Sequence, residues 1–267
     1  MSPWRLRQAL FAALVLALVV LGAASAQTNA TARYGGTLVV GLANGTPPCL
    51  DPTLNCGSSA VEIYQVMCQR LYQVVSNHGR LEDAPMLAAG QPTLSKDKLT
   101  YTVQLKQGVT FNDGTPLTAQ AVATSIQRLM TYPGSARATD YASVASVSAA
   151  GQSTVVFHMK HRDSTLVSNY MFVFSPTALA SNGQSFGSNP VCVGPFMYDH
   201  TSPSGVTLVK SPWYYDRNSI YLDKIVYEGM SDGPAAAAAL EAGDLQALDN
   251  VSPAVLPASR RTAACGS

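Results

Sequence analysis

The sequence predicts an α/β to α+β fold in which helices flank a mixed β-sheet, and three patterns carry this prediction. Residues 36–43 form a nearly continuous apolar run, which is typical of a strand buried inside a mixed or parallel sheet. Residues 99–106 alternate apolar and polar side chains, as a strand with one wet face does. Residues 121–130 repeat apolar side chains at helical spacing, and Thr118 is well placed to cap that helix.

The other elements follow from the same patterns. A helix is expected over 59–74, capped by Ser58 or Ser59 and with Glu62 in its first turn. Residues 164–175 are apolar enough for either a helix or a strand, and the pattern does not decide between them. The remaining expectations are a surface segment over the Ser- and Ala-rich run 135–151, strands at 154–158 and 206–209, and a helix at 234–242 that Gly243 ends.

The composition narrows the class of protein. Charged residues make up only 12% of the 267 residues, below the roughly 25% of ordinary soluble chains, whereas the hydrophobic share of 47% allows a sizeable core. The formal net charge of +1 becomes −1 once the two arginines of the leader are removed. Nucleic acid is therefore not an expected partner, because its binding needs a basic face. Low charge with many Ser, Thr, Gln and Ala fits an exported bacterial protein.

Residues 1–26 read as a secretory signal peptide. Arg5 and Arg7 precede an apolar stretch over 10–21, and Ala24-Ser25-Ala26 forms a cleavage site. An uncleaved anchor is the alternative, but the apolar stretch is shorter than the roughly 20 residues that span a bilayer. No cysteine lies near the cleavage point, so a lipid anchor is not supported. We therefore expect a soluble periplasmic or secreted product in an oxidising compartment, with 27–34 as a polar linker.

Five cysteines in an exported chain indicate disulfides. Cys49 and Cys56 are close in sequence, whereas Cys68 and Cys192 are far apart. These four allow three pairings, of which we favour Cys49–Cys56 with Cys68–Cys192, leaving Cys265 free. A zinc site is disfavoured because no pair of cysteines has the short spacing that zinc sites use.

Two further patterns have the residue types of a metal site or a catalytic site. His158 and His161 would face opposite sides of a strand, which makes them a poor metal pair. The run 183–187 has the form G-x-S-x-G, and His200 follows it, so a secreted serine hydrolase using Ser185 and His200 is an alternative function. The run lacks the preceding strand and following helix that a nucleophile elbow needs. We therefore predict neither catalysis nor a cofactor, and the hydrolase alternative stays open.

Several motifs resemble extracellular solute-binding protein family 5, the dipeptide-, oligopeptide- and nickel-binding proteins of ABC importers. The run GVTFNDGTPLTA at 108–119 is the most specific of them, although its Asp113-Gly114 pair also suits an ordinary turn. The run PVCVGPF at 190–196 departs from the family pattern, since Cys192 and Val193 replace the usual Gly and Thr. Shorter matches are GGTLVV at 35–40, LDP at 50–52 and YLDKI at 221–225.

This resemblance implies the first lobe of a type II-like periplasmic binding protein over 35–249, with 250–267 as an irregular tail. Because family members are much longer, we expect a truncated chain, and a nonfunctional fragment is a further alternative. The implied function is capture of a peptide or a related small solute by hinge closure of two lobes, and its delivery to a membrane ABC permease. A monomer without enzymatic activity is expected.

One set of candidate ligand residues follows from the resemblance, and a second set follows from aromatic chemistry. In this family the loop that leaves the first strand borders the ligand cleft, and the alternative is a plain connecting loop. Trp213 and Tyr214 have the chemistry to stack on a ligand, but packing against the sheet is the favoured reading. The loop candidates are Asn44, Gly45, Thr46 and Pro47.

Overall fold

The computed structural model describes residues 33–169 and 171–250. Contacts between residues divide the chain into two units that meet between Arg33 and Tyr34, and nearly all described residues belong to the second unit. The predicted signal peptide and Cys265 lie outside the described residues. Within the described residues, no helix is long and apolar enough to cross a membrane.

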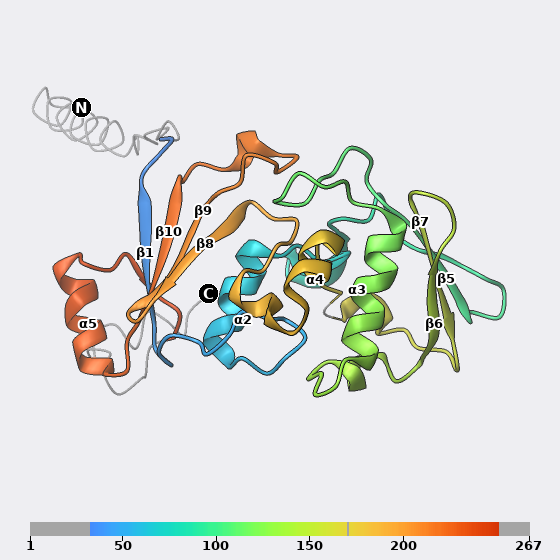
Figure 1. The fold of residues 1–267 in the computed structure, drawn as a ribbon, viewed down its shortest axis with the longest axis horizontal. Coiled ribbons are helices and arrows are strands. Elements are labelled where there is room, and N and C mark those ends of the chain that lie inside the picture. The colour runs from blue at the N-terminus through green and yellow to red at the C-terminus, as the bar shows by residue number, and fades with distance from the viewer. Residues whose placement is uncertain (1–32, 170, 251–267) are drawn as a thin grey trace, which may run out of the picture. The chain divides into compact units, whose positions relative to one another are not determined.

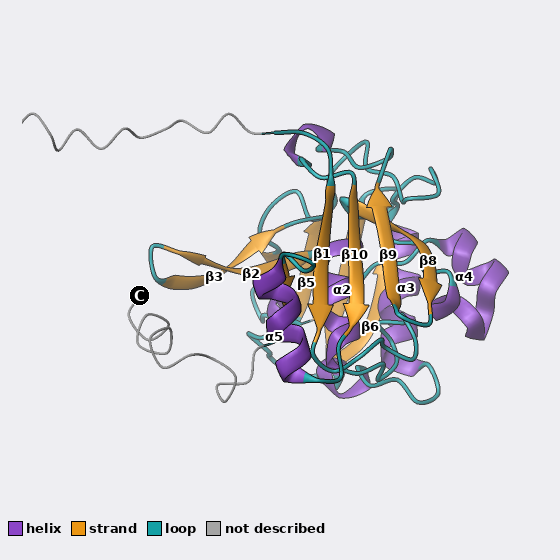
Figure 2. Cartoon of the chain, turned by 90° about the vertical axis from the view of Figure 1, so that its left-hand side faces the viewer, coloured by secondary structure: helices purple, strands orange, loops and turns teal. Residues whose placement is uncertain are grey.

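A five-stranded mixed sheet contains the first strand of the fold, β1 (Thr37–Leu42). β1 lies between β10 (Lys224–Gly229) and β11 (Ala247–Leu248) and pairs with both in parallel. β9 (Gly205–Lys210) joins β10 antiparallel, and β8 (Phe196–Ser202) forms the far edge. Figures 1 and 2 show β1 and β10 running together while β9 runs back between β10 and β8. The mixed sheet is therefore confirmed, and β1 lies between two other strands, although only Gly41 and Leu42 of its residues are buried.

A four-stranded antiparallel sheet packs against helix α3 (Ala119–Thr131). Strand β5 (Thr100–Gln104) has the alternation that the sequence predicts, with Tyr101 and Val103 buried. The Thr118 side chain accepts a hydrogen bond from the Ala121 backbone N–H, which confirms the predicted cap. The other strands of this sheet are β4 (Thr93–Leu94), β6 (Val144–Ala149) and β7 (Thr154–Met159), in the order β4-β5-β7-β6.

The helix predicted over 59–74 starts within one residue of the expected position, but its predicted cap and its predicted end are wrong. α2 spans Ser58–Met67 and is preceded by Gly57, which makes no side-chain cap bond, and its first turn holds no acidic residue. It stops because Cys68 is extended and disulfide-bonded to Cys192. Strands β2 (Tyr72–Asn77) and β3 (Arg80–Pro85) then form a separate hairpin. Apolar residues after Met67 continue the core, which is why helical spacing seemed to persist in the sequence.

Two stretches without a clear sequence pattern fold into the core. Over 164–175 the chain forms a short 3-10 turn, η3 (Leu166–Ser168), and then an extended run with Met171 and Phe174 fully buried, so neither a helix nor a regular strand forms. A hydrogen bond fixes the backbone at Phe174, whose N–H donates to Ser125 Oγ at 2.9 Å. Most residues of the stretch predicted as surface are exposed or half-buried, as expected, but it contains η2 (Ala138–Tyr141) and β6, and Tyr141 is only 1% exposed.

The two disulfides have the pairing that the sequence favours. Cys49 bonds to Cys56, and Cys68 bonds to Cys192. The last helix, α5, ends as expected at Gly243, whose φ of 85° is left-handed. The remaining helical segments are α4 (Pro176–Asn182), η4 (Gly183–Ser188), η5 (Arg217–Ser219) and α5 (Gly233–Ala242).

Candidate functional site

The carboxyl ends of β1, β10 and β11 lie at one edge of the five-stranded sheet, because the three strands are parallel. We call this the carboxyl edge. The chain leaving β1 there forms the loop of Asn44, Gly45, Thr46 and Pro47. Small molecules commonly bind outside the carboxyl ends of strands in open α/β sheets, so this position suits a binding loop.

Close packing holds the loop against the end of β10. A Cβ atom added to Gly229 would lie 2.6 Å from the Thr46 backbone nitrogen and from Thr46 Oγ1, so only glycine allows this approach. The Met230 backbone N–H donates to the carbonyl of Leu42 at 2.8 Å, and Gly45 N–H donates to the same carbonyl at 3.0 Å. The loop is therefore fixed by backbone contacts from the neighbouring strand.

Side chains tie the loop to two further elements. Asn44 Nδ2 donates to Ser58 Oγ at the start of α2 at 3.0 Å, and Asp249 Oδ1, just after β11, accepts from the Ala43 N–H at 2.7 Å. Asn44 is exposed, Thr46 is half-buried and Pro47 is buried. The loop therefore exposes the Asn44 side chain, while Pro47 is packed into the interior.

A buried ion pair fixes the segment that follows this loop. Asp51 accepts two hydrogen bonds from the Arg128 guanidinium of α3, at 2.7 and 2.9 Å, and their side chains are 1% and 9% exposed. Arg128 also lies over the Tyr132 ring, 4.3 Å from its centre. The Asp of the LDP motif thus joins the segment after β1 to the helix of the other sheet, which sequence spacing alone did not reveal.

Trp213 and Tyr214 lie at the opposite edge of the same sheet. They follow β9, whose residue Val209 pairs with Lys224 at the start of β10, whereas the loop follows the end of β1 beside Gly229. A strand of six residues spans about 20 Å. The structure therefore does not bring the two groups of candidates together.

Tyr214 is mainly a packing residue, which was the favoured reading. It is 8% exposed, and its hydroxyl oxygen accepts from Gln69 Nε2 at 2.6 Å. Gln69 Oε1 accepts in turn from the Tyr215 hydroxyl at 3.1 Å. Burial raises the pKa of Tyr214 further than its hydrogen bond to Gln69 lowers it. Gln69 was not singled out in the sequence, since its two tyrosines lie more than 140 residues away.

The Asp113-Gly114 turn of the motif at 108–119 packs against the Trp213 ring. A Cβ atom on Gly114 would lie 3.2 Å from the Trp213 ring, and Gly114 has a φ of +81°. Asp113 accepts bonds from Thr115 and from Ser175 Oγ. Burial by itself would raise the pKa of Asp113, but these hydrogen bonds outweigh it and the pKa is lowered. The Asp-Gly pair is thus a turn, as expected, and it also packs under an aromatic side chain.

The alternative chemical sites gain no support from the described residues. Ser185 lies in the 3-10 segment η4 after helix α4, so no strand precedes it as a nucleophile elbow requires. His200 lies on β8, where its Nδ1 is 2.9 Å from an Asp199 carboxylate oxygen, and both side chains are exposed. Among the described residues no group of three or more His, Cys, Asp or Glu side chains could hold a metal ion.

The fold agrees with comparisons to known proteins. The family model for bacterial extracellular solute-binding proteins, family 5 Middle, matches residues 84–264. The chain therefore belongs to this family, as its motifs indicate. The glutathione-binding protein GsiB of Shigella flexneri serotype 5b is 27% identical over 235 residues, which cover 86% of this chain and 45% of the relative.

Solved structures with the same fold bind different solutes. The oligopeptide-binding protein AppA of Bacillus subtilis, in complex with a nonapeptide, is 26% identical with a TM-score of 0.70, covering 80% of this chain and 44% of that one. MoaA of A. tumefaciens R10, in complex with mannopinic acid, is 26% identical with a TM-score of 0.71 and the same coverage. The chain spans a little under half the length of the curated relatives it matches.

Proposed function

We propose that this protein captures a peptide or a related small solute outside the cytoplasm and delivers it to an ABC permease. Family membership supports this role, and so do the relatives that bind glutathione and a nonapeptide. The observation that carries the proposal is the tethered loop of residues 44–47 at the carboxyl edge. The protein acts as a monomer after cleavage behind Ala26, and it performs no covalent chemistry.

In this proposal the loop forms one wall of the solute site. The Asn44 Oδ1 atom and the backbone carbonyls of Gly45 and Thr46 accept hydrogen bonds from peptide N–H groups, because the Asn44 Nδ2 and Gly45 N–H groups already have partners within the protein. Because contacts from β10, α2 and the residue after β11 hold the loop in place, the loop loses little conformational entropy when a solute binds. A second lobe closes over the solute by a hinge motion, and the chain leading away from β11 starts at this same edge.

Thermal unfolding of the exported, processed protein tests the proposal. Glutathione, a dipeptide mixture and a nonapeptide mixture are added separately, each as the only solute. A solute at about a hundred times its Kd stabilises by about 2.7 kcal/mol, which raises the midpoint by about 5–10 °C for a chain of this size. If none of these solutes moves the midpoint of a cooperative transition, peptide capture by this chain is contradicted.

A further inference from the structure

The amino-terminal edge of the five-stranded sheet presents an exposed aromatic surface. Its members are Tyr34, Trp213, Tyr215 and Tyr221, which are 66%, 48%, 39% and 45% exposed. We call these four the aromatic edge. Among the described residues, no other large aromatic side chain is as exposed as these four. The exposed aliphatic side chains lie elsewhere: Val74 and Leu81 are on the β2–β3 hairpin, and Leu94 is on β4.

Within the aromatic edge, direct contacts join Tyr34 to Tyr221. Tyr34 packs against Tyr221 with ring centres 5.0 Å apart, and the Gly35 N–H donates to the Tyr221 carbonyl at 2.7 Å. A largely apolar surface pocket of about 420 Å³ is lined by both Tyr221 and Tyr214, and the Tyr214 ring centre lies 4.6 Å from that of Tyr215. The pocket is lined by Pro195, Phe196, Tyr214, Ser219, Ile220, Tyr221 and Leu222.

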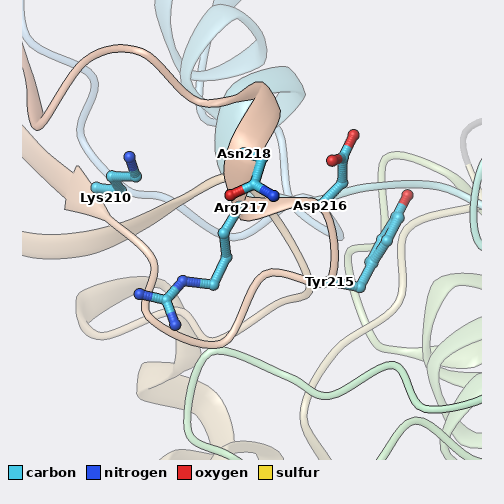
Figure 3. A pocket seen from close by; sticks show the side chains of 5 residues that line it. All are labelled: Lys210, Tyr215, Asp216, Arg217 and Asn218. Carbon is cyan, nitrogen blue, oxygen red and sulfur yellow. The ribbon is translucent and has the colours of Figure 1, made fainter. Parts of the chain in front are cut away.

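Cationic side chains border the same surface. Lys106 Nζ lies 5.1 Å from the centre of the Tyr215 ring. Lys210 and Arg217 line a second pocket with Tyr215, and Figure 3 shows Arg217 extending away from the neighbouring Asp216 carboxylate. Among the described residues Arg217 is exposed and has no ion-pair partner, so its charge is available to an outside anion.

We propose that the aromatic edge docks the processed protein on the surface of a bilayer that contains anionic lipids. Tryptophan and tyrosine are the side chains that gather at membrane–water interfaces, where rings enter the headgroup layer and polar tips stay wet. Lysine and arginine beside them are attracted to anionic headgroups. The edge therefore combines the apolar and the electrostatic parts of interfacial binding.

The charges around the aromatic edge favour an anionic lipid surface over a neutral soluble partner, because Lys106, Lys210 and Arg217 all border it. The loop at 44–47 lies at the other end of the strands, which leaves the carboxyl edge facing away from a bilayer bound in this way.

Intrinsic fluorescence of the exported protein tests the proposal, after mass spectrometry has verified leader removal. The chain has two tryptophans, and because Trp4 is lost with the leader, emission then reports on Trp213 alone. Vesicles of equal parts phosphatidylglycerol and phosphatidylcholine are expected to shift this emission to shorter wavelength, and brominated acyl chains are expected to quench it. Pure phosphatidylcholine vesicles and 0.5 M NaCl are expected to weaken both effects, since salt screens the headgroup charge.

Matched variants distinguish vesicle binding through the aromatic edge from non-specific vesicle binding. Vesicle co-sedimentation measures the binding of each variant. Tyr221→Ala is expected to reduce partitioning roughly tenfold, and Arg217→Gln about fivefold. Leu81→Ala and Lys96→Gln remove an exposed aliphatic and an exposed cation on other elements, and both are expected to leave partitioning unchanged. Circular dichroism checks the fold of each variant, and Arg217→Gln stands as the test if Tyr221→Ala does not fold.

Three results would overturn the proposal. The first is tryptophan emission that anionic vesicles do not change. The second is an equal loss of partitioning in the Leu81→Ala and Lys96→Gln controls. The third is vesicle-free self-association of the protein that Tyr221→Ala abolishes, because a second copy of the chain would then be the occupant of the aromatic edge.

Discussion

The two edges of the five-stranded sheet differ in what they expose and in how they are held. At the carboxyl edge the exposed group of the loop is the Asn44 amide, and contacts from β10, α2 and the residue after β11 fix the loop. At the aromatic edge large rings and cations reach the solvent, and they surround shallow pockets. A polar, pre-organised loop suits recognition of a small solute, whereas a broad aromatic and cationic surface suits a lipid interface.

Breaking the buried Asp51–Arg128 ion pair should have the largest effect on the free energy of unfolding. Arg128→Met leaves the Asp51 carboxylate buried without its partner, so we expect the free energy of unfolding to fall by about 3–5 kcal/mol. Chemical denaturation of the two proteins measures the difference. Asp199→Asn is the control, because that exposed pair with His200 should contribute less than about 1 kcal/mol. Equal losses in both variants would contradict a special role for the buried pair.

A substitution at Gly229 should disturb the loop itself. In Gly229→Ala the new methyl group meets Thr46, so the loop must shift, at a cost of roughly 1–3 kcal/mol in unfolding free energy. Solute affinity should fall more than stability does, because the displaced residues belong to the proposed site. Gly90→Ala is the matched control, since nothing lies within 4 Å of a Cβ there. Calorimetric titration and thermal unfolding of both variants separate the two effects.

Acid should selectively weaken the turn under Trp213. The folded-state pKa of Asp113 lies below its unfolded value, so its stabilisation is complete above the unfolded pKa and is lost as the pH falls through the folded pKa. We expect the difference in Tm between the wild-type protein and Asp113→Asn to be present at pH 6 and to shrink below about pH 4. A difference that stays constant down to pH 2.5 would assign the effect to packing.

Local patterns were sufficient for some elements and not for others. Helix α3 was predictable with its cap, because Thr118 and the apolar spacing act within one turn of each other. The end of α2 was not, because apolar residues at helical spacing continue past Met67 while the chain becomes extended at Cys68. The buried run ending at Phe174 is fixed by distant partners, including Ser125 on α3.

The candidate site was predictable in part, for a related reason. The loop at 44–47 follows directly from the first strand and from the family resemblance. That Trp213 lies far from it depends on the antiparallel direction of β9, which no short-range pattern records. Arg128 and Gln69 also escaped notice, because their partners Asp51 and Tyr214 are 77 and 145 residues away.

Hydrogen–deuterium exchange of the processed protein, with and without a solute that raises its Tm, tests the central claim most directly. The account predicts that the solute slows exchange over residues 43–48, next to β1, and leaves residues 211–222 unchanged. Slower exchange over 211–222 without any change over 43–48 would contradict it, because the solute would then occupy the aromatic edge.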